Sequence, residues 1–281
     1  MSGGSGTAYA PNIRPEWDAL IGLLASKNIM ANSAEADWQR WGDENPYFGV
    51  LNDPKFLSAN LDGESREEFF RSGELHLNHV YSIIHARIRE NFQAKAILDF
   101  GCGVGRLLIP FTRRAPVVVG VDVSPGMLQE AAKNCRERGD VAVRLLRSDE
   151  LDQLEANSFD LIHSYIVFQH IPVAEGEHLL RNLIRLMAVG GVGVIHLVFS
   201  DARSALRRAV LAVRSRSNLM HGFFNLAQSK PFSWPLMQMN TYSMNRVFNL
   251  LVDSHCTNLH VEFEDHGGFR GAVLYFEKKN V

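Results

Sequence analysis

Between residues 94 and 199, short apolar runs alternate with longer stretches in which apolar residues recur at helical spacing. The apolar runs predict strands at 94–100, 117–123, 141–146, 159–165 and 192–199. The stretches between them predict helices at 105–113, 125–138 and 174–187. Pro110 falls inside the first of these helices, and we expect it to bend that helix. Alternation of this kind predicts a parallel sheet that is buried between two layers of helices.

The C-terminal section follows a different order. A helical period covers residues 243–255, and two further apolar runs, at 258–264 and 272–278, are joined by the short segment 265–270. Strands joined by so short a connection pair in antiparallel orientation. The whole pattern therefore predicts an α/β fold with a doubly wound, mostly parallel seven-stranded sheet that ends in an antiparallel hairpin.

The chain before residue 94 shows helical patterns but no strand pattern. Residues 1–11 are rich in glycine and serine, lack the basic start and apolar core of a signal peptide, and predict a disordered tail. Residues 12–93 predict a helical N-terminal cap, in which one helix starts after Ser33 and an apolar stripe covers 65–90.

Composition and charge narrow the class of function. A hydrophobic content of 46% and a charged content of 21% are typical of globular proteins, and the net charge of −2 gives no reason to expect a nucleic-acid partner. No apolar run is long enough for a transmembrane helix, so we expect no stable membrane insertion. The three cysteines (Cys102, Cys135 and Cys256) are few and widely spaced, which favours a reducing, cytoplasmic location. His76 and His79 lie at helical spacing without further ligand-type neighbours, so no metal is expected.

The clearest local signal is the loop after the first predicted strand, where residues 96–108 read AILDFGCGVGRLL. A strand that breaks into a glycine turn at a helix N-terminus lets the backbone approach a ligand closely. The dinucleotide-binding fingerprint G-x-G-x-x-G would need its third glycine at Arg106. The spacing is instead Asp-x-Gly-x-Gly-x-Gly, with Asp99 two residues before the first glycine.

This pattern resembles motif I of the class I S-adenosylmethionine-dependent methyltransferases. Later segments add to the resemblance: Asp122 ends the second predicted strand, and Arg147-Ser148-Asp149-Glu150 follows the third. Residues 159–172 read FDLIHSYIVFQHIP, which resembles motif IV of the family and the loop after it. The turn at 186–191 is similar to the family's L-x-P-G-G turn, with Val189 in place of the proline.

The resemblance implies S-adenosylmethionine as cofactor and S-adenosylhomocysteine as product. The Asp122 carboxylate would accept hydrogen bonds from the ribose hydroxyls, although a nicotinamide cofactor would also place an acid there. Asp149, with Glu150 as the alternative, would meet the adenine amino group, and Arg106 or the loop amides would hold the methionine carboxylate. The residues assigned to the cofactor are Asp99, Gly101, Cys102, Gly103, Gly105, Arg106, Asp122, Val123, Met127, Ser148, Asp149, Glu150, Tyr165 and Gln169.

Methyl transfer from a sulfonium needs the acceptor held in line with the methyl carbon, and a general base only for a hydroxyl or a charged amine. His170 follows the fourth predicted strand and is our candidate base, because imidazole titrates near neutrality. Tyr165 is the second candidate catalytic residue, and Gln169 is a neighbour that could orient the acceptor. His196, within the fifth predicted strand, is interpreted as a core histidine.

The predicted function is therefore methyl transfer to O or N of a small molecule by a monomer or homodimer. Residues 94–281 would form the S-adenosylmethionine-binding domain, and an insertion at 200–240 would act as a lid. Two alternatives stay open: a methyltransferase acting on a protein, tRNA or lipid-linked glycan, which the arginine-rich stretch 203–216 favours, and a non-catalytic S-adenosylmethionine-binding module.

Overall fold

A computed structural model describes residues 34–139 and 143–280. The predicted tail at 1–11, the first part of the cap and the predicted capping residue Ser33 lie outside the described residues. Within the described ranges, no helix is long and apolar enough to cross a membrane.

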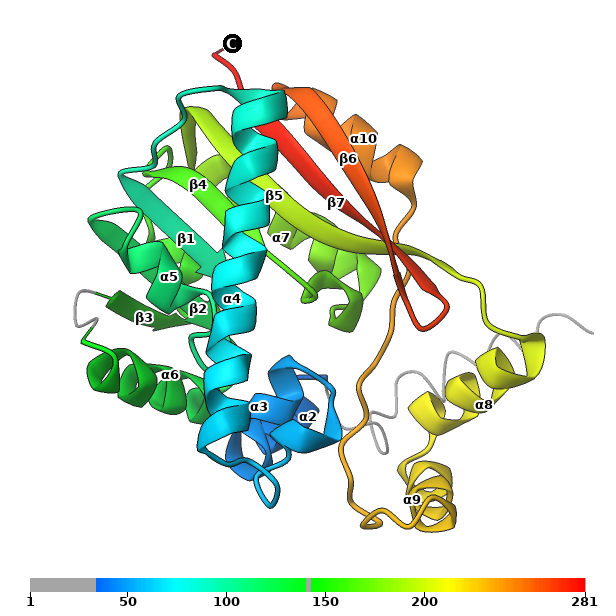
Figure 1. Ribbon diagram of the computed structural model, residues 1–281. Coiled ribbons are helices and arrows are strands. Elements are labelled where there is room, and N and C mark those ends of the chain that lie inside the picture. The colour runs from blue at the N-terminus through cyan, green and yellow to red at the C-terminus, as the bar shows by residue number, and fades with distance from the viewer. Residues whose placement is uncertain (1–33, 140–142, 281) are drawn as a thin grey trace, which may run out of the picture.

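A seven-stranded sheet forms the centre of the structure, in the order β3-β2-β1-β4-β5-β7-β6 (Figure 1). The strands are β1 (Ala96–Phe100), β2 (Val117–Asp122), β3 (Val143–Arg147), β4 (Phe159–Ser164), β5 (Met187–Asp201), β6 (Cys256–His266) and β7 (Phe269–Lys278). The first five pair in parallel, whereas β7 lies antiparallel between β5 and β6. The predicted mostly parallel sheet with an antiparallel terminal hairpin is confirmed.

Helices cover both faces of this sheet. They are α2 (Ala34–Glu44), α3 (Pro46–Val50), α4 (Gly63–Ile83), α5 (Leu108–Thr112), α6 (Pro125–Glu137), α7 (Val173–Leu186), α8 (Ala205–Arg216), α9 (Asn218–Ala227) and α10 (Met244–Asp253). Short helical turns lie at Pro54–Phe56, Ser148–Gln153 and Phe168–His170, and a π-helical turn at Ile84–Ile88 extends α4. In Figure 1, the long helix α4 runs across one face, while α7 and α10 lie behind the sheet.

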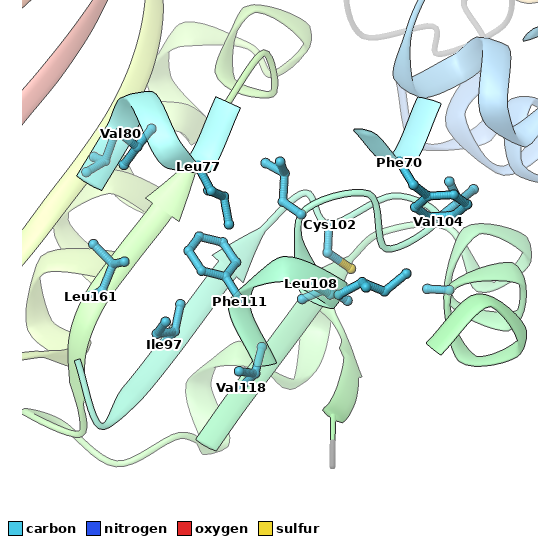
Figure 2. Close-up of a cluster of buried hydrophobic side chains, with 14 of the residues drawn as sticks. Phe70, Leu77, Val80, Ile97, Cys102, Val104, Leu108, Phe111, Val118 and Leu161 are labelled. Carbon is cyan, nitrogen blue, oxygen red and sulfur yellow. The ribbon is translucent and has the colours of Figure 1, made fainter. Parts of the chain in front are cut away.

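Strand alternation produces two separate hydrophobic cores. Ile97 and Leu161 point to the face covered by α4 and α5, whereas their neighbours Leu98 and Ile162 join the core under α7 and α10. Figure 2 shows side chains of the first core, in which Leu77 of α4 and Phe111 of α5 lie near Ile97. Because these side chains are almost fully buried, they fix α4 against this face of the sheet.

The helix after the glycine loop is shorter than predicted. The sequence predicts it over 105–113, but α5 starts only at Leu108, and residues 101–107 stay in the loop. Pro110 therefore falls in the first turn, where a missing N–H costs no helical hydrogen bond, and the predicted bend is wrong.

The terminal hairpin is longer and its turn tighter than predicted. β6 continues to His266 and β7 begins at Phe269, so Gly267 and Gly268 alone make the turn rather than the whole segment 265–270. Both glycines have positive φ (65° and 91°), as a two-residue turn that matches the twist of its strands requires. Because its strands are longer than predicted, the hairpin extends beyond the end of β4, and this extension has polar side chains.

The segment after β5 leaves the sheet and then returns to it. Figure 1 shows α8 and α9 projecting away from the sheet. The chain then packs the Trp234 ring against Trp41 of α2, with ring centroids 5.1 Å apart. Asn240 donates its N–H to the Gln169 carbonyl at 2.6 Å, which fixes the end of the segment to the loop after β4.

A glycine allows α4 to approach the glycine loop. A Cβ on Gly73 would overlap the carbonyl oxygen of Arg106. We expect Gly73→Ala to lower the free energy of unfolding in urea by about 1–3 kcal/mol, because this backbone contact cannot yield like a flexible side chain. Gly63→Ala, at the open start of the same helix, is the control and should change stability by less than about 1 kcal/mol. Equal effects of the two substitutions would contradict this account of the helix contact.

Candidate active site

A cavity of about 380 Å³ opens at the carboxyl ends of the parallel strands β1, β2 and β4. Doubly wound sheets bind ligands at this edge, and the volume lies within the range of small-molecule sites. The part of the cap that the structure describes supplies one wall. The lining residues are Ala34, Glu35, Trp38, Gly49, Val50, Asp99, Phe100, Gly101, Cys102, Gly103, Arg106, Leu107, Asp122, Val123, Met127, Ser148, Tyr165, Ile166, Val167, His170, Ile171, Pro172, Glu175 and Leu179.

The glycine loop forms the floor of the cavity. Gly101, Gly103 and Gly105 have φ values of 76°, 52° and 86°, a region that side-chain-bearing residues avoid. A Cβ on Gly101 would overlap Val167, and one on Gly103 would lie 2.5 Å from Val50. The loop is thus shaped by both backbone conformation and close packing, and it leaves its backbone exposed to a ligand.

Asp122 links the end of β2 to the glycine loop. One carboxylate oxygen accepts the Gly103 N–H at 2.9 Å and the other accepts the Ser124 N–H at 3.0 Å. Burial raises the pKa of Asp122 to about 6, although these backbone hydrogen bonds act in the opposite direction. Each oxygen keeps a further lone pair for a ligand, because a carboxylate accepts about four hydrogen bonds.

Arg106 and Asp99 bring opposite charges to the cavity wall. The Arg106 guanidinium is almost fully buried and donates to Ser72 Oγ at 3.3 Å, while its Nε has no partner among the described residues. Burial lowers the pKa of Arg106. Asp99 accepts a hydrogen bond from His163 Nδ1 at 2.8 Å, and His163 Nε2 lies 3.2 Å from His76 Nε2. Asp99 therefore orients a pair of histidines that the sequence did not predict.

His170 lines the cavity, but both of its ring nitrogens are engaged. Nδ1 donates to the Gln238 carbonyl at 2.7 Å, and Nε2 lies 3.3 Å from the amide nitrogen of Gln169, which donates to it. Burial lowers the pKa of His170 to about 4. The ring of Trp38 packs against it with centroids 4.9 Å apart. His170 is therefore a neutral, fixed imidazole at neutral pH.

Tyr165 faces the opposite direction, towards the hairpin. Its hydroxyl donates to the Glu264 carboxylate, with the two oxygens at 3.0 and 3.2 Å. Burial and the negative charge of Glu264 both raise the pKa of Tyr165, so the phenol stays protonated.

The structure brings most of the predicted site residues to the cavity and leaves four away from its lining. Gly105 packs against Ala131 of α6. Asp149 accepts from Arg147 Nε at 3.1 Å, and Glu150 accepts the Arg147 N–H at 2.8 Å. Gln169 is buried beside His170. The other predicted residues, which line the cavity, are Asp99, Gly101, Cys102, Gly103, Arg106, Asp122, Val123, Met127, Ser148, Tyr165 and His170.

Two groups of lining residues were not identified from the sequence. Trp38, Gly49 and Val50 come from α2 and α3, which lie far from the glycine loop along the chain. Ile166, directly after Tyr165, has a φ of 60°, which is strained for a β-branched residue. No spacing signal marks these positions. The packing of the cap brings Trp38, Gly49 and Val50 to the cavity, whereas the backbone turn after β4 places Ile166 there.

Comparison with known proteins shows which family the central part of the chain matches. Residues 97–191 match a family described as a methyltransferase domain. The chain contains a methyltransferase domain of the class I, S-adenosylmethionine-dependent family. The resemblance found in the sequence is thereby confirmed.

Curated relatives match the methyltransferase domain over part of their length. The chain is 32% identical over 108 residues to a ubiquinone biosynthesis O-methyltransferase of Caulobacter sp. (strain K31), covering 38% of this chain and 42% of the relative. It is 36% identical over 93 residues to the aklanonic acid methyltransferase DauC of Streptomyces sp. (strain C5), covering 32% of this chain and 42% of the relative. The match thus spans about two fifths of each relative.

Solved structures share the fold of the methyltransferase domain. The magnesium protoporphyrin IX methyltransferase ChlM from Synechocystis PCC 6803 with bound SAH aligns with a TM-score of 0.58 and 15% identity, covering 88% of this chain and 100% of that one. A SAM-dependent methyltransferase from Methanosarcina mazei aligns with a TM-score of 0.52 and 15% identity, covering 71% of this chain and 98% of that one.

The lowered pKa of His170 has a consequence for stability. As the pH falls, the unfolded chain binds a proton near 6.5 but the folded protein only near 4, so the stabilisation present above pH 6.5 is lost progressively towards pH 4. Between pH 7 and 5 this histidine should cost about 2 kcal/mol of unfolding free energy.

Urea unfolding at both pH values tests this, with His170→Asn as the comparison because the asparagine amide can still donate to Gln238. The variant should lose about 2 kcal/mol less than the parent protein between the two pH values. Identical losses would contradict the assignment.

Proposed function

We propose that the protein transfers a methyl group from S-adenosylmethionine to O or N of a small-molecule acceptor. The observation that carries this proposal is the cavity itself. It joins the glycine loop, the buried Asp122 carboxylate and the buried Arg106 guanidinium under a wall supplied by the cap.

The polar groups of the cavity match the parts of this cofactor. Asp122 would accept hydrogen bonds from the ribose hydroxyls, while Val123, Met127 and Ser148 line the side on which the adenine would lie. Arg106 would hold the methionine carboxylate, and the unpartnered Nε of its buried guanidinium supports this role. Burial opposes the charged form of the guanidinium, so a carboxylate ligand beside Arg106 would offset part of that electrostatic cost.

In this proposal, the rate enhancement comes mainly from positioning the acceptor against the methyl group. The sulfonium already carries a good leaving group, and holding the acceptor in line with the methyl carbon can contribute about 7–11 kcal/mol. The proposal gives His170 a positioning role rather than the predicted role of general base, because both ring nitrogens are engaged and its pKa is lowered to about 4. Tyr165 stays a candidate for contact with the acceptor.

The walls of the cavity favour a small acceptor. The cap closes one side with Trp38, Gly49 and Val50, and no described lining residue comes from the insertion at 200–240. In this proposal the cap, and not the predicted lid, encloses the acceptor. Both relatives, an O-methyltransferase of ubiquinone biosynthesis and an aklanonic acid methyltransferase, support a small-molecule acceptor, and the first supports an oxygen acceptor.

Two arginines of the insertion, Arg203 and Arg214, give limited support to a macromolecular acceptor. Arg203 binds the carboxylate of Asp201 and stacks over the Phe269 ring. Arg214 donates to His221 and Asn225 within the α8–α9 pair. Both side chains therefore serve internal contacts instead of forming a free basic surface.

The direct test supplies the purified protein with methyl-labelled S-adenosylmethionine and a lysate of the source organism. The lysate is then separated into low-mass, protein, RNA and lipid fractions. Label in the low-mass fraction is the expected result. Label in protein, RNA or lipid would overturn the small-molecule acceptor, and absence of transfer together with tight cofactor binding would support a non-catalytic module.

The raised pKa of Asp122 predicts how cofactor affinity depends on pH. Below a pKa of about 6 the carboxyl is protonated and loses acceptor capacity for the ribose hydroxyls. The dissociation constant of S-adenosylhomocysteine, measured by calorimetry, should rise about tenfold between pH 7.5 and 5, in proportion to the ionised fraction.

Asp122→Asn should bind weakly at both pH values. Asp160→Asn is the matched control, because Asp160 also accepts two backbone N–H bonds, from Lys95 and Ala96, but at the other end of β1. If the Asp122 variant kept the affinity of the parent protein, this residue would not hold the ribose.

A further inference from the structure

Three potential metal ligands meet where β5 and β6 flank β7 in the sheet. His196 comes from β5, and Glu264 and His266 come from β6. Glu264 Oε2 lies 3.0 Å from His266 Nε2 and 3.8 Å from His196 Nε2, and one ligand atom from each residue lies within 4.8 Å of the other two. The three residues are named below the hairpin cluster.

An ordinary ion pair does not explain the burial of His196. Its side chain is 0% exposed, and neither ring nitrogen has a hydrogen-bond partner among the described residues. A buried imidazole without partners loses its hydration with no compensation, and such groups are rare in folded proteins. The predicted interpretation as a packed core histidine leaves this cost unexplained.

The hairpin is shaped around the same imidazole. A Cβ on Gly271 of β7 would overlap His196 Nε2, so glycine at this position makes room for the ring. Imidazole nitrogens are the commonest protein ligands of transition metals, and neither nitrogen of this ring forms a hydrogen bond among the described residues.

We propose that His196, Glu264 and His266 bind one divalent transition-metal ion such as Zn²⁺. Two imidazoles and one carboxylate are a donor set that zinc and its neighbours in the first transition series accept. Ligand bonds of about 2.0–2.2 Å place the donors roughly 3–3.5 Å apart, so small side-chain rotations would complete the site. Glu264 and His266 are about one-third exposed, which leaves room for water at the remaining positions.

A nearby pair shows what a simple ion pair looks like on the same face. His79 of α4 lies 2.9 Å from Glu262 Oε2, and the second partner of this carboxylate is the Tyr275 hydroxyl at 3.0 Å. Among the described residues, His79 is the one histidine that contacts this glutamate, and it is more than half exposed. The hairpin cluster differs by its second, fully buried imidazole.

The hairpin cluster adjoins the cavity through Tyr165. The hydroxyl of this lining residue donates to Glu264, and its ring lies 5.3 Å from that of His196. If the proposed function holds, the ion would lie on the acceptor side and could bind an acceptor oxygen. A bound metal lowers the pKa of such an oxygen, which would favour its attack on the methyl group.

Metal binding is tested on the whole chain without reference to methyl transfer. The protein is treated with a chelator, dialysed, and titrated with Zn²⁺ by calorimetry and with Co²⁺ by visible absorption. We expect one ion per chain and the absorption bands of a low-coordinate cobalt site. His266→Ala and His196→Leu should each weaken binding by at least about 100-fold, whereas the control His79→Ala should bind like the parent protein.

Circular dichroism and affinity for S-adenosylhomocysteine verify that each variant is folded. His266 lies at the end of the hairpin, so its variant keeps the test valid if His196→Leu fails to fold. Absence of binding by the parent protein, or unchanged binding by the His266 variant, would overturn the metal site. If the ion binds but no acceptor is ever methylated, the site stands and the proposed function fails instead.

Discussion

The hydrogen bond from the Gly103 amide to the Asp122 carboxylate is the contact on which the arrangement of the site depends. It joins a loop that only glycines can form to the end of the neighbouring strand. Because the same carboxylate also accepts the Ser124 N–H at the start of α6, one buried anion sets the positions of the loop, β2 and that helix. The cavity exists where these three elements meet.

Around this contact the structure keeps several polar groups in an apolar setting. Arg106 is buried with an unpartnered Nε, Asp99 holds His163 against His76, and the ring nitrogens of His196 have no hydrogen-bond partner among the described residues. Such groups reduce the stability of the folded state unless a ligand satisfies them. Their concentration beside one cavity is therefore a physical argument for a binding site, independent of any similarity to other proteins.

The cap links fold stability to the site. Its helix α4 rests on the first hydrophobic core, and the close approach at Gly73 lets it contact the backbone of Arg106. The wall formed by Trp38, Gly49 and Val50 depends on the same packing. Displacement of the cap would open the cavity and expose the buried arginine together.

The sequence by itself determined the strand order along the chain, the glycine turn after β1 and the acid at the end of β2, because periodicity and motif spacing are local properties. It could not place Trp38 beside His170, bring His163 to Asp99, or bring His196 to Glu264 and His266. These partners are separated by long stretches of chain, and only the pairing of strands and the docking of helices bring them together. The start of α5 at Leu108 was likewise decided by tertiary contacts, since the amides of residues 101–103 donate to the Val121 carbonyl and the Asp122 carboxylate of β2.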